Sequence, residues 1–272
     1  MAVKAPTGQI YNENCLDTIS RMMPESVDLT ITSPPYDSMR TYGGFSVDFE
    51  NIIKGLYRIT KEGGAVIWVV ADQTINGSET GTSFRQALMF MDAGFRLHDT
   101  MIYRKINPIP QNHNRYEQSW EYMFVFTKGS PKTFNPIRVH TKYAGKPMNW
   151  GGRKTKMDDN QCRRDRDSEI IITQADKIHE NIFEYSIGGG NSGHPAVFPD
   201  ALAYDQIITW TNKGDVVYDP FMGSGTTAVG CIKSGRNYIG SEINPDYCAI
   251  IEKRIKNTSY ISSLEEFYTE DN

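Results

Sequence analysis

The stretch that most constrains the fold of this 272-residue chain lies at residues 215–242. It holds a predicted strand at 215–218, a glycine-rich turn at 223–225, a helical run at 226–234 and a second predicted strand at 237–241. Two strands joined by one helix in this way run parallel, because the helix must cross over one face of the sheet. Parallel strands need cover on both faces. The stretch therefore predicts an α/β protein with a largely parallel sheet.

The rest of the chain repeats this alternation. Residues 65–70 form a continuous apolar run, which is typical of a buried parallel strand. Another strand is predicted at 27–32, and apolar residues at helical spacing follow at 49–59. Further along the chain we expect a helix at 83–91, strands at 97–103 and 121–126, and helices at 201–211 and 245–255. The pattern predicts a mixed, mostly parallel sheet with helices on both faces.

Residues 129–193 interrupt this alternation with few apolar runs and many Gly, Asn and charged residues. We expect them to form an inserted region. The predicted boundaries are then 1–128 and 194–257 for the two halves of one α/β domain, and 258–272 for an acidic tail. A chain of this length can bury a sizeable core.

The charge of the chain is uneven. Its net charge is −4, yet the stretch from Lys128 to Arg166 carries 11 Lys or Arg and only three Asp. A solvated face is one explanation of such a block. Tyr143 and Trp150 stand among these cations, which favours a surface that contacts phosphates and bases.

The cysteines (Cys15, Cys162, Cys231 and Cys248) form no C-x-x-C pair, and the five histidines form no H-x-x-x-H pair. We therefore expect reduced thiols and no metal site. The sequence contains no run of eighteen apolar residues, and its first residues lack the apolar stretch of a signal peptide. We expect a cytoplasmic protein with no membrane contact.

The glycine-rich turn fits the G-x-G-x-x-G/A pattern of nucleotide-binding turns, with Gly223, Gly225 and Ala228 at its fixed positions. Glycines there permit a tight turn and let a cofactor approach the backbone. Glu242 ends the next strand, where an acidic side chain can accept hydrogen bonds from ribose hydroxyls. NAD, FAD and S-adenosylmethionine all bind at such turns. A helix-capping turn without a ligand fits the same pattern.

The strand predicted at 27–32 is followed by Ser33-Pro34-Pro35-Tyr36. The prolines stiffen the backbone and lack an N–H, so the Ser33 hydroxyl and the Pro34 carbonyl can point together as hydrogen-bond acceptors. Such acceptors would stabilise the positive charge that develops when an amino nitrogen attacks a methyl donor. With the aromatic Tyr36 after the prolines, the segment suits a planar ring that bears an amino group. A proline-stiffened turn without function is the alternative explanation.

Together these motifs resemble those of the S-adenosylmethionine-dependent DNA amino-methyltransferases, which methylate the exocyclic nitrogen of cytosine or adenine. The resemblance rests on Ser-Pro-Pro-Tyr, on residues 219–227, which begin Asp-Pro-Phe, and on residues 235–242, which end with Glu242. Their order along the chain resembles the permuted branch of the family, in which the target-recognition region lies between the motifs. The resemblance implies a Rossmann-like methyltransferase fold with 129–193 as that region.

The resemblance also implies roles for individual residues. Asp219 would hold the amino group of S-adenosylmethionine and Glu242 its ribose, while residues 194–199 would line the methionine end. Asn14 stands where relatives carry the Asp that contacts adenine, so the Cys15 backbone amide is the better candidate there. The implied cofactor residues are Asn14, Cys15, Phe198, Pro199, Asp219, Phe221, Gly223, Ser224, Gly225, Thr226 and Glu242.

The implied reaction methylates DNA at N4 of cytosine and leaves S-adenosylhomocysteine, with no metal. Ser-Pro-Pro-Tyr leans towards N4-cytosine in this family, and N6-adenine stays open. The implied catalytic residues are Ser33, Pro34, Pro35 and Tyr36. The residues expected to contact DNA are Arg40, Arg153, Lys154, Lys156, Arg163, Arg164 and Arg166.

Other functions stay open at this point. An RNA or protein-glutamine methyltransferase would use a related tetrapeptide, and a nicotinamide-dependent oxidoreductase would use only the glycine-rich turn. A non-catalytic DNA-binding module would only retain the fold. Methylation at ring carbon 5 is disfavoured, because that chemistry uses a cysteine that usually follows a proline, and none does here. A cognate restriction endonuclease and a homodimer are open as partners.

Overall fold

The computed structural model describes residues 7–35, 47–108, 114–150, 169–186 and 199–269. The chain divides into two compact units, and each is described by itself. The larger unit comprises Met1–Asn135 and Asn181–Asn272, and the smaller comprises Pro136–Glu180.

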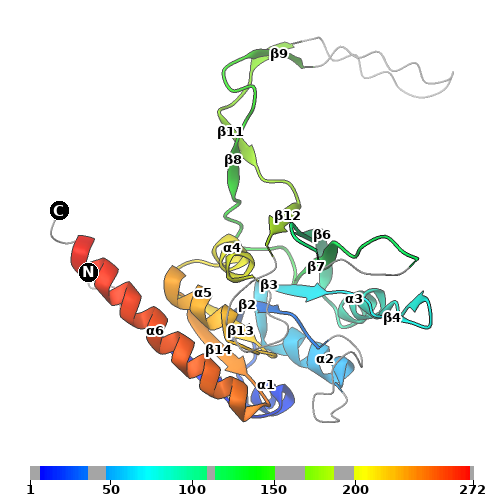
Figure 1. The fold of residues 1–272 in the computed structure, drawn as a ribbon, viewed down its shortest axis with the longest axis vertical. Helices are drawn as coiled ribbons and strands as arrows, with labels where there is room; N and C mark the ends of the chain where they lie inside the picture. The colour runs from blue at the N-terminus through cyan, green and yellow to red at the C-terminus, as the bar shows by residue number, and fades with distance from the viewer. Residues whose placement is uncertain (1–6, 36–46, 109–113, 151–168, 187–198, 270–272) are drawn as a thin grey trace. The chain divides into compact units, whose positions relative to one another are not determined.

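An eight-stranded sheet forms the centre of the larger unit, in the order β1-β14-β13-β2-β3-β7-β6-β12 (Figure 1). Strand β7 runs antiparallel to its neighbours β3 and β6, and every other pair is parallel. The predicted mixed, mostly parallel sheet is thus confirmed. Its strands are β1 (Gly8–Tyr11), β2 (Val27–Thr32), β3 (Thr60–Val70), β6 (Arg96–Lys105), β7 (Trp120–Thr127), β12 (Ile182–Tyr185), β13 (Val216–Asp219) and β14 (Asn237–Ser241).

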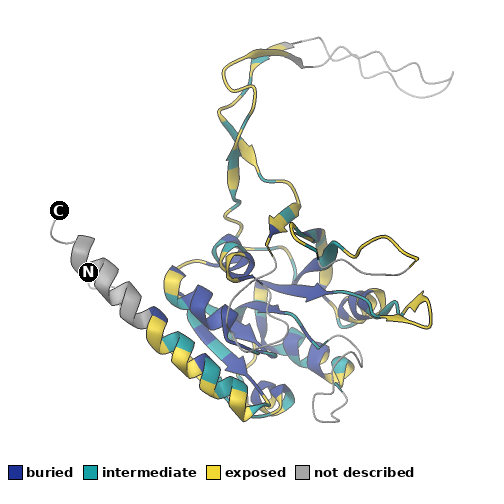
Figure 2. Ribbon diagram, in the orientation of Figure 1, coloured by how far each residue is buried: buried dark blue, intermediate teal, exposed yellow. Residues whose placement is uncertain are grey.

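Helices cover both faces of this sheet, and the core has one layer on each side (Figure 2). Side chains alternate along β3: Ile67 and Val69 face one layer, whereas Trp68 and Val70 face the other. The first layer includes residues of α4 (Asp200–Trp210), α5 (Thr226–Ser234) and α6 (Pro245–Thr269). The second includes residues of α1 (Cys15–Arg21), α2 (Phe49–Ile59) and α3 (Thr82–Asp92).

Some element boundaries differ from those that the sequence predicts. Strand β3 begins at Thr60, five residues before the apolar run, and passes through Gly63, whose φ is +80°. The pairing of β2 with β3 shifts register between Val27 and Leu29, so the first part of β3 joins the sheet through an irregularity. Helix α6 continues to Thr269, past the predicted end at residue 255.

The smaller unit is a two-stranded antiparallel ribbon. Strand β8 (Arg138–His140) pairs with β11 (Asp176–Ile178), and β9 (Pro147–Trp150) pairs with β10 (Glu169–Ile172). Between these pairs the hydrogen bonds continue: Thr141 N donates to Ala175 O at 2.9 Å, and Thr173 N to Lys146 O at 3.0 Å. The unit lies inside the predicted insert at 129–193.

A short hairpin of β4 (Thr74–Ile75) and β5 (Ser78–Glu79) precedes α3. Its turn residues, Asn76 and Gly77, both have positive φ, as a two-residue hairpin turn requires. Within the described ranges, no helix is long and apolar enough to span a bilayer. Cys15, Cys231 and Cys248 are free thiols.

Candidate active site

The predicted site residues that the structure describes gather at one edge of the sheet. Strands β1, β14, β13, β2 and β3 are mutually parallel, so their carboxyl ends lie on the same side. Strand β2 leads there into Ser33 and Pro34, and its neighbour β13 leads into the glycine-rich turn. In open α/β sheets, ligands bind outside this edge. The tetrapeptide and the turn, far apart in sequence, thus follow adjacent strands.

A buried carboxylate joins these two strands. Asp219, the last residue of β13, is 1% exposed. The Thr32 hydroxyl donates to its Oδ1 at 2.6 Å, and the Thr227 hydroxyl donates to its Oδ2 at 2.6 Å. The backbone N–H of Phe221 donates to Oδ1 at 3.0 Å. Because Thr32 directly precedes Ser33, Asp219 ties the start of the tetrapeptide to the turn and to α5.

Burial raises the pKa of Asp219 to about 6, and the hydrogen bonds from Thr227, Thr32 and the Phe221 N–H oppose that rise. These donors stabilise the ionised carboxylate, which is the form present at neutral pH. Both oxygens of Asp219 already accept hydrogen bonds from the protein. The contact with a cofactor amino group stays a prediction, and the contacts that the structure shows are internal.

The glycine-rich turn has a backbone that few other residues could adopt. Gly223 and Gly225 have φ values of +53° and +84°, and Gly225 is the N-cap of α5. A Cβ at Gly225 would lie 3.1 Å from Cγ2 of Ile251 in α6. Gly225 is therefore favoured by its φ and also by the close packing of α6 against the turn. The sequence pattern alone indicates only that a cofactor can approach the backbone there.

Glu242 holds the turn from the neighbouring strand end. Its Oε2 accepts from Gly223 N at 2.8 Å, and its Oε1 accepts from Asn244 N at 2.8 Å. Glu242 is 8% exposed, and burial raises its pKa, against the effect of these two N–H donors. The predicted ribose acceptor therefore has a structural contact with the turn that the sequence did not reveal.

Asn14 has a local role that sequence reasoning missed. Its side-chain oxygen accepts from Leu16 N at 2.9 Å, which makes it the N-cap of α1. The signal was available, since Asn before a helical run is a typical cap. Cys15 follows as the first helical residue, and burial raises the pKa of its thiol to about 12. This thiol is protonated at neutral pH, so it is no nucleophile.

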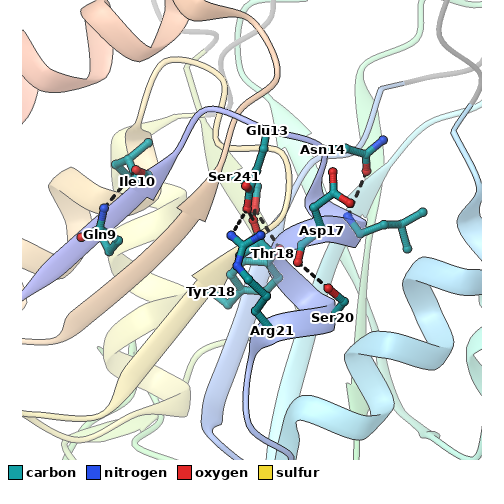
Figure 3. Close-up of polar contacts among 11 residues, drawn as sticks. Gln9, Ile10, Glu13, Asn14, Asp17, Thr18, Ser20, Arg21, Tyr218 and Ser241 are labelled. Atoms are coloured by element: carbon teal, nitrogen blue, oxygen red, sulfur yellow. Dashed lines mark hydrogen bonds and ion pairs between the residues drawn. The ribbon is translucent and has the colours of Figure 1, made fainter.

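A chain of hydroxyls anchors α1 beneath the sheet edge (Figure 3). The Tyr218 hydroxyl lies 3.0 Å from the Ser241 hydroxyl, which donates to Thr18 Oγ1 at 2.9 Å. Thr18 in turn donates to Oε1 of Glu13 at 2.5 Å, and Arg21 also hydrogen-bonds this oxygen. The hydrogen bond from Arg21 lowers the pKa of Glu13, followed by that from Thr18. The chain connects β13, β14 and α1, and so fixes the segment that holds Asn14 and Cys15.

The tetrapeptide begins in a firmly packed environment. Pro34 is buried, and Ser33 and Pro35 are half-buried. Thr32 pairs with Trp68 of β3, and the Trp68 ring meets the Phe221 ring of the turn edge to face at 6.3 Å. Trp68 therefore lies next to the strand that ends before Ser33 and also contacts Phe221, which precedes the glycine-rich turn.

Asp72, which follows β3, is hydrogen-bonded to the first turn of a helix. It accepts hydrogen bonds from the Ser83 N–H at 3.0 Å and the Ser83 hydroxyl at 2.5 Å at the start of α3. It also lines a small pocket with Phe84, Trp120 and Tyr122. The pocket lies at the carboxyl end of β3, where Val70 pairs with Tyr122 of β7. It is therefore on the same edge of the sheet as Ser33.

Pro199 is buried and is the N-cap of α4. Ser224 and Thr226 are also buried, and their contacts are with α6. Among the residues described, no group of His, Cys, Asp or Glu could hold a metal ion. The other predicted site residues lie outside the described residues: Tyr36, Arg40, Arg153, Lys154, Lys156, Arg163, Arg164, Arg166 and Phe198.

A family model described as DNA methylase, for N6- and N4-methyltransferases, matches residues 27–253 of this chain. The chain is 48% identical over 241 residues to the orphan methyltransferase M.BamHII of Bacillus amyloliquefaciens, with 85% of this chain and 89% of that protein covered. It is 26% identical over 298 aligned positions to the type II methyltransferase M.MthZI of Methanothermobacter thermautotrophicus, with 94% and 79% covered.

Two solved structures show the same fold. The PvuII DNA methyltransferase, described as cytosine-N4-specific, matches with a TM-score of 0.67 at 21% identity, over 92% of this chain and 87% of that one. The M1.HpyAVI–SAM complex matches with a TM-score of 0.58 at 24% identity, over 91% and 100%. The fold predicted from the motifs is confirmed.

Proposed function

Because the chain belongs to the N6/N4 DNA methylase family, we propose that it transfers a methyl group from S-adenosylmethionine to the exocyclic amino group of a base at a specific DNA sequence, with N4 of cytosine preferred. The observation that carries this proposal is the Asp219 link. It joins the start of Ser-Pro-Pro-Tyr to the glycine-rich turn, and a methyl transfer between two bound molecules requires the two binding segments to lie close together.

The residues at the turn fit S-adenosylmethionine. The positive φ of Gly223 and Gly225 permits the tight turn that such a cofactor requires, and Glu242, directly after β14, is an acidic residue that can accept hydrogen bonds from ribose hydroxyls. We propose that Asp219, Phe221 and Glu242 hold the cofactor, together with the Asn14–Cys15 segment at the end of β1. When bound, the cofactor supplies an electrophilic methyl group, and S-adenosylhomocysteine is the product.

The chain's own residues act on the amino group of the target base. That nitrogen is a poor nucleophile because its lone pair is delocalised into the ring. We propose that the Ser33 hydroxyl oxygen and the Pro34 carbonyl oxygen accept hydrogen bonds from the two N–H groups of this nitrogen. These hydrogen bonds favour the tetrahedral geometry that attack requires. Pro34 is buried, so this acceptor is fixed before the base arrives. Tyr36 is proposed to stack on the flipped base.

The choice of N4-cytosine rests on the serine that begins the tetrapeptide. N6-adenine is the alternative, because the family includes enzymes that act on either base. Analysis of methylated nucleosides distinguishes the two.

For DNA binding we propose the ribbon of the smaller unit together with the arginines and lysines of residues 151–168. The major groove of B-DNA admits a two-stranded β-ribbon. Tyr143 of the ribbon is half exposed, and the ammonium groups of Lys142 and Lys146 lie 5.9 and 5.6 Å from the centre of its ring. Of the described cations in this unit, Arg138 and Lys177 are in ion pairs, whereas Lys142 and Lys146 are not.

Long-read sequencing of DNA from cells that express the protein tests the proposal. We expect one short sequence motif in which the cytosine is modified at N4 throughout the genome. Methylated adenine would favour the alternative base. Unmodified DNA together with methylated RNA or protein would contradict the proposal.

The same experiment with a nuclease screen tests whether a restriction endonuclease accompanies the enzyme. A cytoplasmic location and a homodimer are further proposals, the latter tested by sedimentation.

A further inference from the structure

Arg254, on helix α6, hydrogen-bonds the glycine-rich turn. Its Nη1 donates to the Ser224 carbonyl oxygen at 2.9 Å, to the Ser224 hydroxyl at 3.0 Å and to the Thr226 hydroxyl at 3.3 Å. Ser224 and Thr226 are 4% and 3% exposed. The guanidinium group therefore contacts the turn in a place from which water is largely excluded.

The other side of the same guanidinium group contacts helix α4. Nη2 donates to both carboxylate oxygens of Asp200, at 2.8 and 3.1 Å. Asp200 is the first residue of α4 and directly follows Pro199, which belongs to a segment predicted to line the methionine end of the cofactor. Arg254 thus joins two segments that the sequence assigned to cofactor binding.

Ile251 supports the turn from the same face of α6, one helical turn before Arg254. It is fully buried, and its Cγ2 would lie 3.1 Å from a Cβ at Gly225, a distance tighter than an ordinary van der Waals contact. Helix α6 thus holds Gly225 by packing and Ser224 by hydrogen bonding.

The contacts of Arg254 with Asp200 and with the turn differ in strength. The side chain of Asp200 is 50% exposed, and ion pairs in such positions contribute little because solvent screens them. The hydrogen bonds to Ser224 are partly buried and charge-assisted, and charge-assisted hydrogen bonds are the stronger kind. The contact with the turn should therefore dominate the effect of Arg254.

We propose that Arg254 is a positioning residue that holds the glycine-rich turn in its cofactor-binding conformation before the cofactor arrives. The proposal rests on the function proposed above. A turn that is already ordered loses little conformational entropy on binding, so its order raises affinity. Arg254 acts through Ser224, and its effect should fall on cofactor affinity and leave the step at the base unchanged.

Calorimetry with S-adenosylmethionine on the full chain tests this role. We expect Arg254→Met, which removes the hydrogen bonds to Ser224 and Thr226, to raise Kd about tenfold. Arg254→Lys should recover only part of the affinity, because an ammonium group cannot reproduce the planar fork of donors. Asp200→Asn should change Kd less than twofold. Lys253→Met, on the exposed face of the same helix, is the matched control.

Methylation kinetics separate a positioning role from a merely structural one. Arg254→Met should raise KM for S-adenosylmethionine while kcat at saturating cofactor stays within about twofold. A variant that melts at a lower temperature but binds with unchanged Kd would overturn the proposal. If Arg254→Met does not fold, Arg254→Lys decides, and wild-type affinity in that variant would count against the proposed role. A wild-type protein that binds the cofactor but does not methylate DNA would instead refute the proposed function.

Discussion

Asp219 illustrates at the residue scale how a single side chain can organise a site. Its two carboxylate oxygens accept different numbers of hydrogen bonds. Oδ1 accepts one from the Thr32 hydroxyl and one from the Phe221 N–H, whereas Oδ2 accepts one from the Thr227 hydroxyl. A buried acceptor that loses its donor costs about 1–3 kcal/mol, and more if it is charged. The two threonines should therefore differ in their effect on stability.

We predict that Thr227→Val destabilises the protein more than Thr32→Val does at neutral pH. Valine has nearly the same shape as threonine but cannot donate, so each variant removes one hydrogen bond. Oδ1 would keep the Phe221 N–H, and Oδ2 would lose the Thr227 donor. Urea unfolding measures the difference, for which we expect about 1 kcal/mol. If both variants lose the same free energy of unfolding, the additional hydrogen bond from the Phe221 N–H to Oδ1 has no effect on stability.

Asp219→Asn should change how stability depends on pH. The folded pKa of about 6 lies above the ordinary value of 3.8, so between these values the folded state binds more protons than the unfolded state. This group therefore contributes stability at low pH that is lost as pH rises towards 6. The loss is on the order of 3 kcal/mol.

The asparagine side chain of this variant would not titrate in this range, so the stability of the variant does not show this decrease as pH rises. We predict that the stability gap between wild type and Asp219→Asn is larger at pH 4 than at pH 7. Urea unfolding of both proteins at each pH measures the gap. A gap that widens as pH rises would show that the folded pKa of Asp219 is lowered.

At the element scale, helix α6 and the glycine-rich turn depend on each other. We predict that Gly225→Val lowers the melting temperature by several degrees as well as abolishing cofactor binding, because valine would require a strained φ of +84° and would press on Ile251. Gly214, with φ +87° but no atom within 4 Å of an added Cβ, is a matched control for the φ strain alone. If Gly225→Val melts no lower than Gly214→Val, the packing against α6 does not matter.

The ribbon formed by β8–β11 allows a test of DNA binding with described residues. We predict that replacing Lys142 and Lys146 together by Ala weakens DNA binding. The slope of log K against log salt should fall by about 0.9 for each phosphate that the variant no longer neutralises. Lys177→Ala is the control, since Lys177 already pairs with Glu180. An unchanged salt slope in the double variant would show that these lysines bind no phosphate.

For the molecule as a whole, local sequence patterns were enough to predict the α/β class and the central strands. Strand β3 and helix α5 could be predicted because an apolar run and a strand–turn–helix motif are local signals. Strands β1 and β12 could not, since each is a four-residue strand at an edge of the sheet with few buried residues. The order of strands in the sheet likewise depends on pairings between distant segments.

The same distinction separates the site residues. Ser33 and Gly225 were predicted because a motif surrounds each of them. The Thr32–Asp219 contact spans 187 residues, and the Arg254–Ser224 contact spans 30 residues across a helix and a strand. No periodicity marks such pairs, because they depend on which strands become neighbours and on how α6 packs.

The central claim is that Ser33 and its neighbours transfer a methyl group to an amino nitrogen of DNA. Mass spectrometry of nucleosides, from DNA incubated with the protein and S-adenosylmethionine, tests it most directly. We predict N4-methylcytosine with the wild type, and a rate lower by roughly 10²–10³ with Ser33→Ala at unchanged cofactor affinity, since one preorganised acceptor is removed. N6-methyladenine would contradict only the choice of base. Methylation at carbon 5, no methylated nucleoside, or full activity of Ser33→Ala would contradict the claim itself.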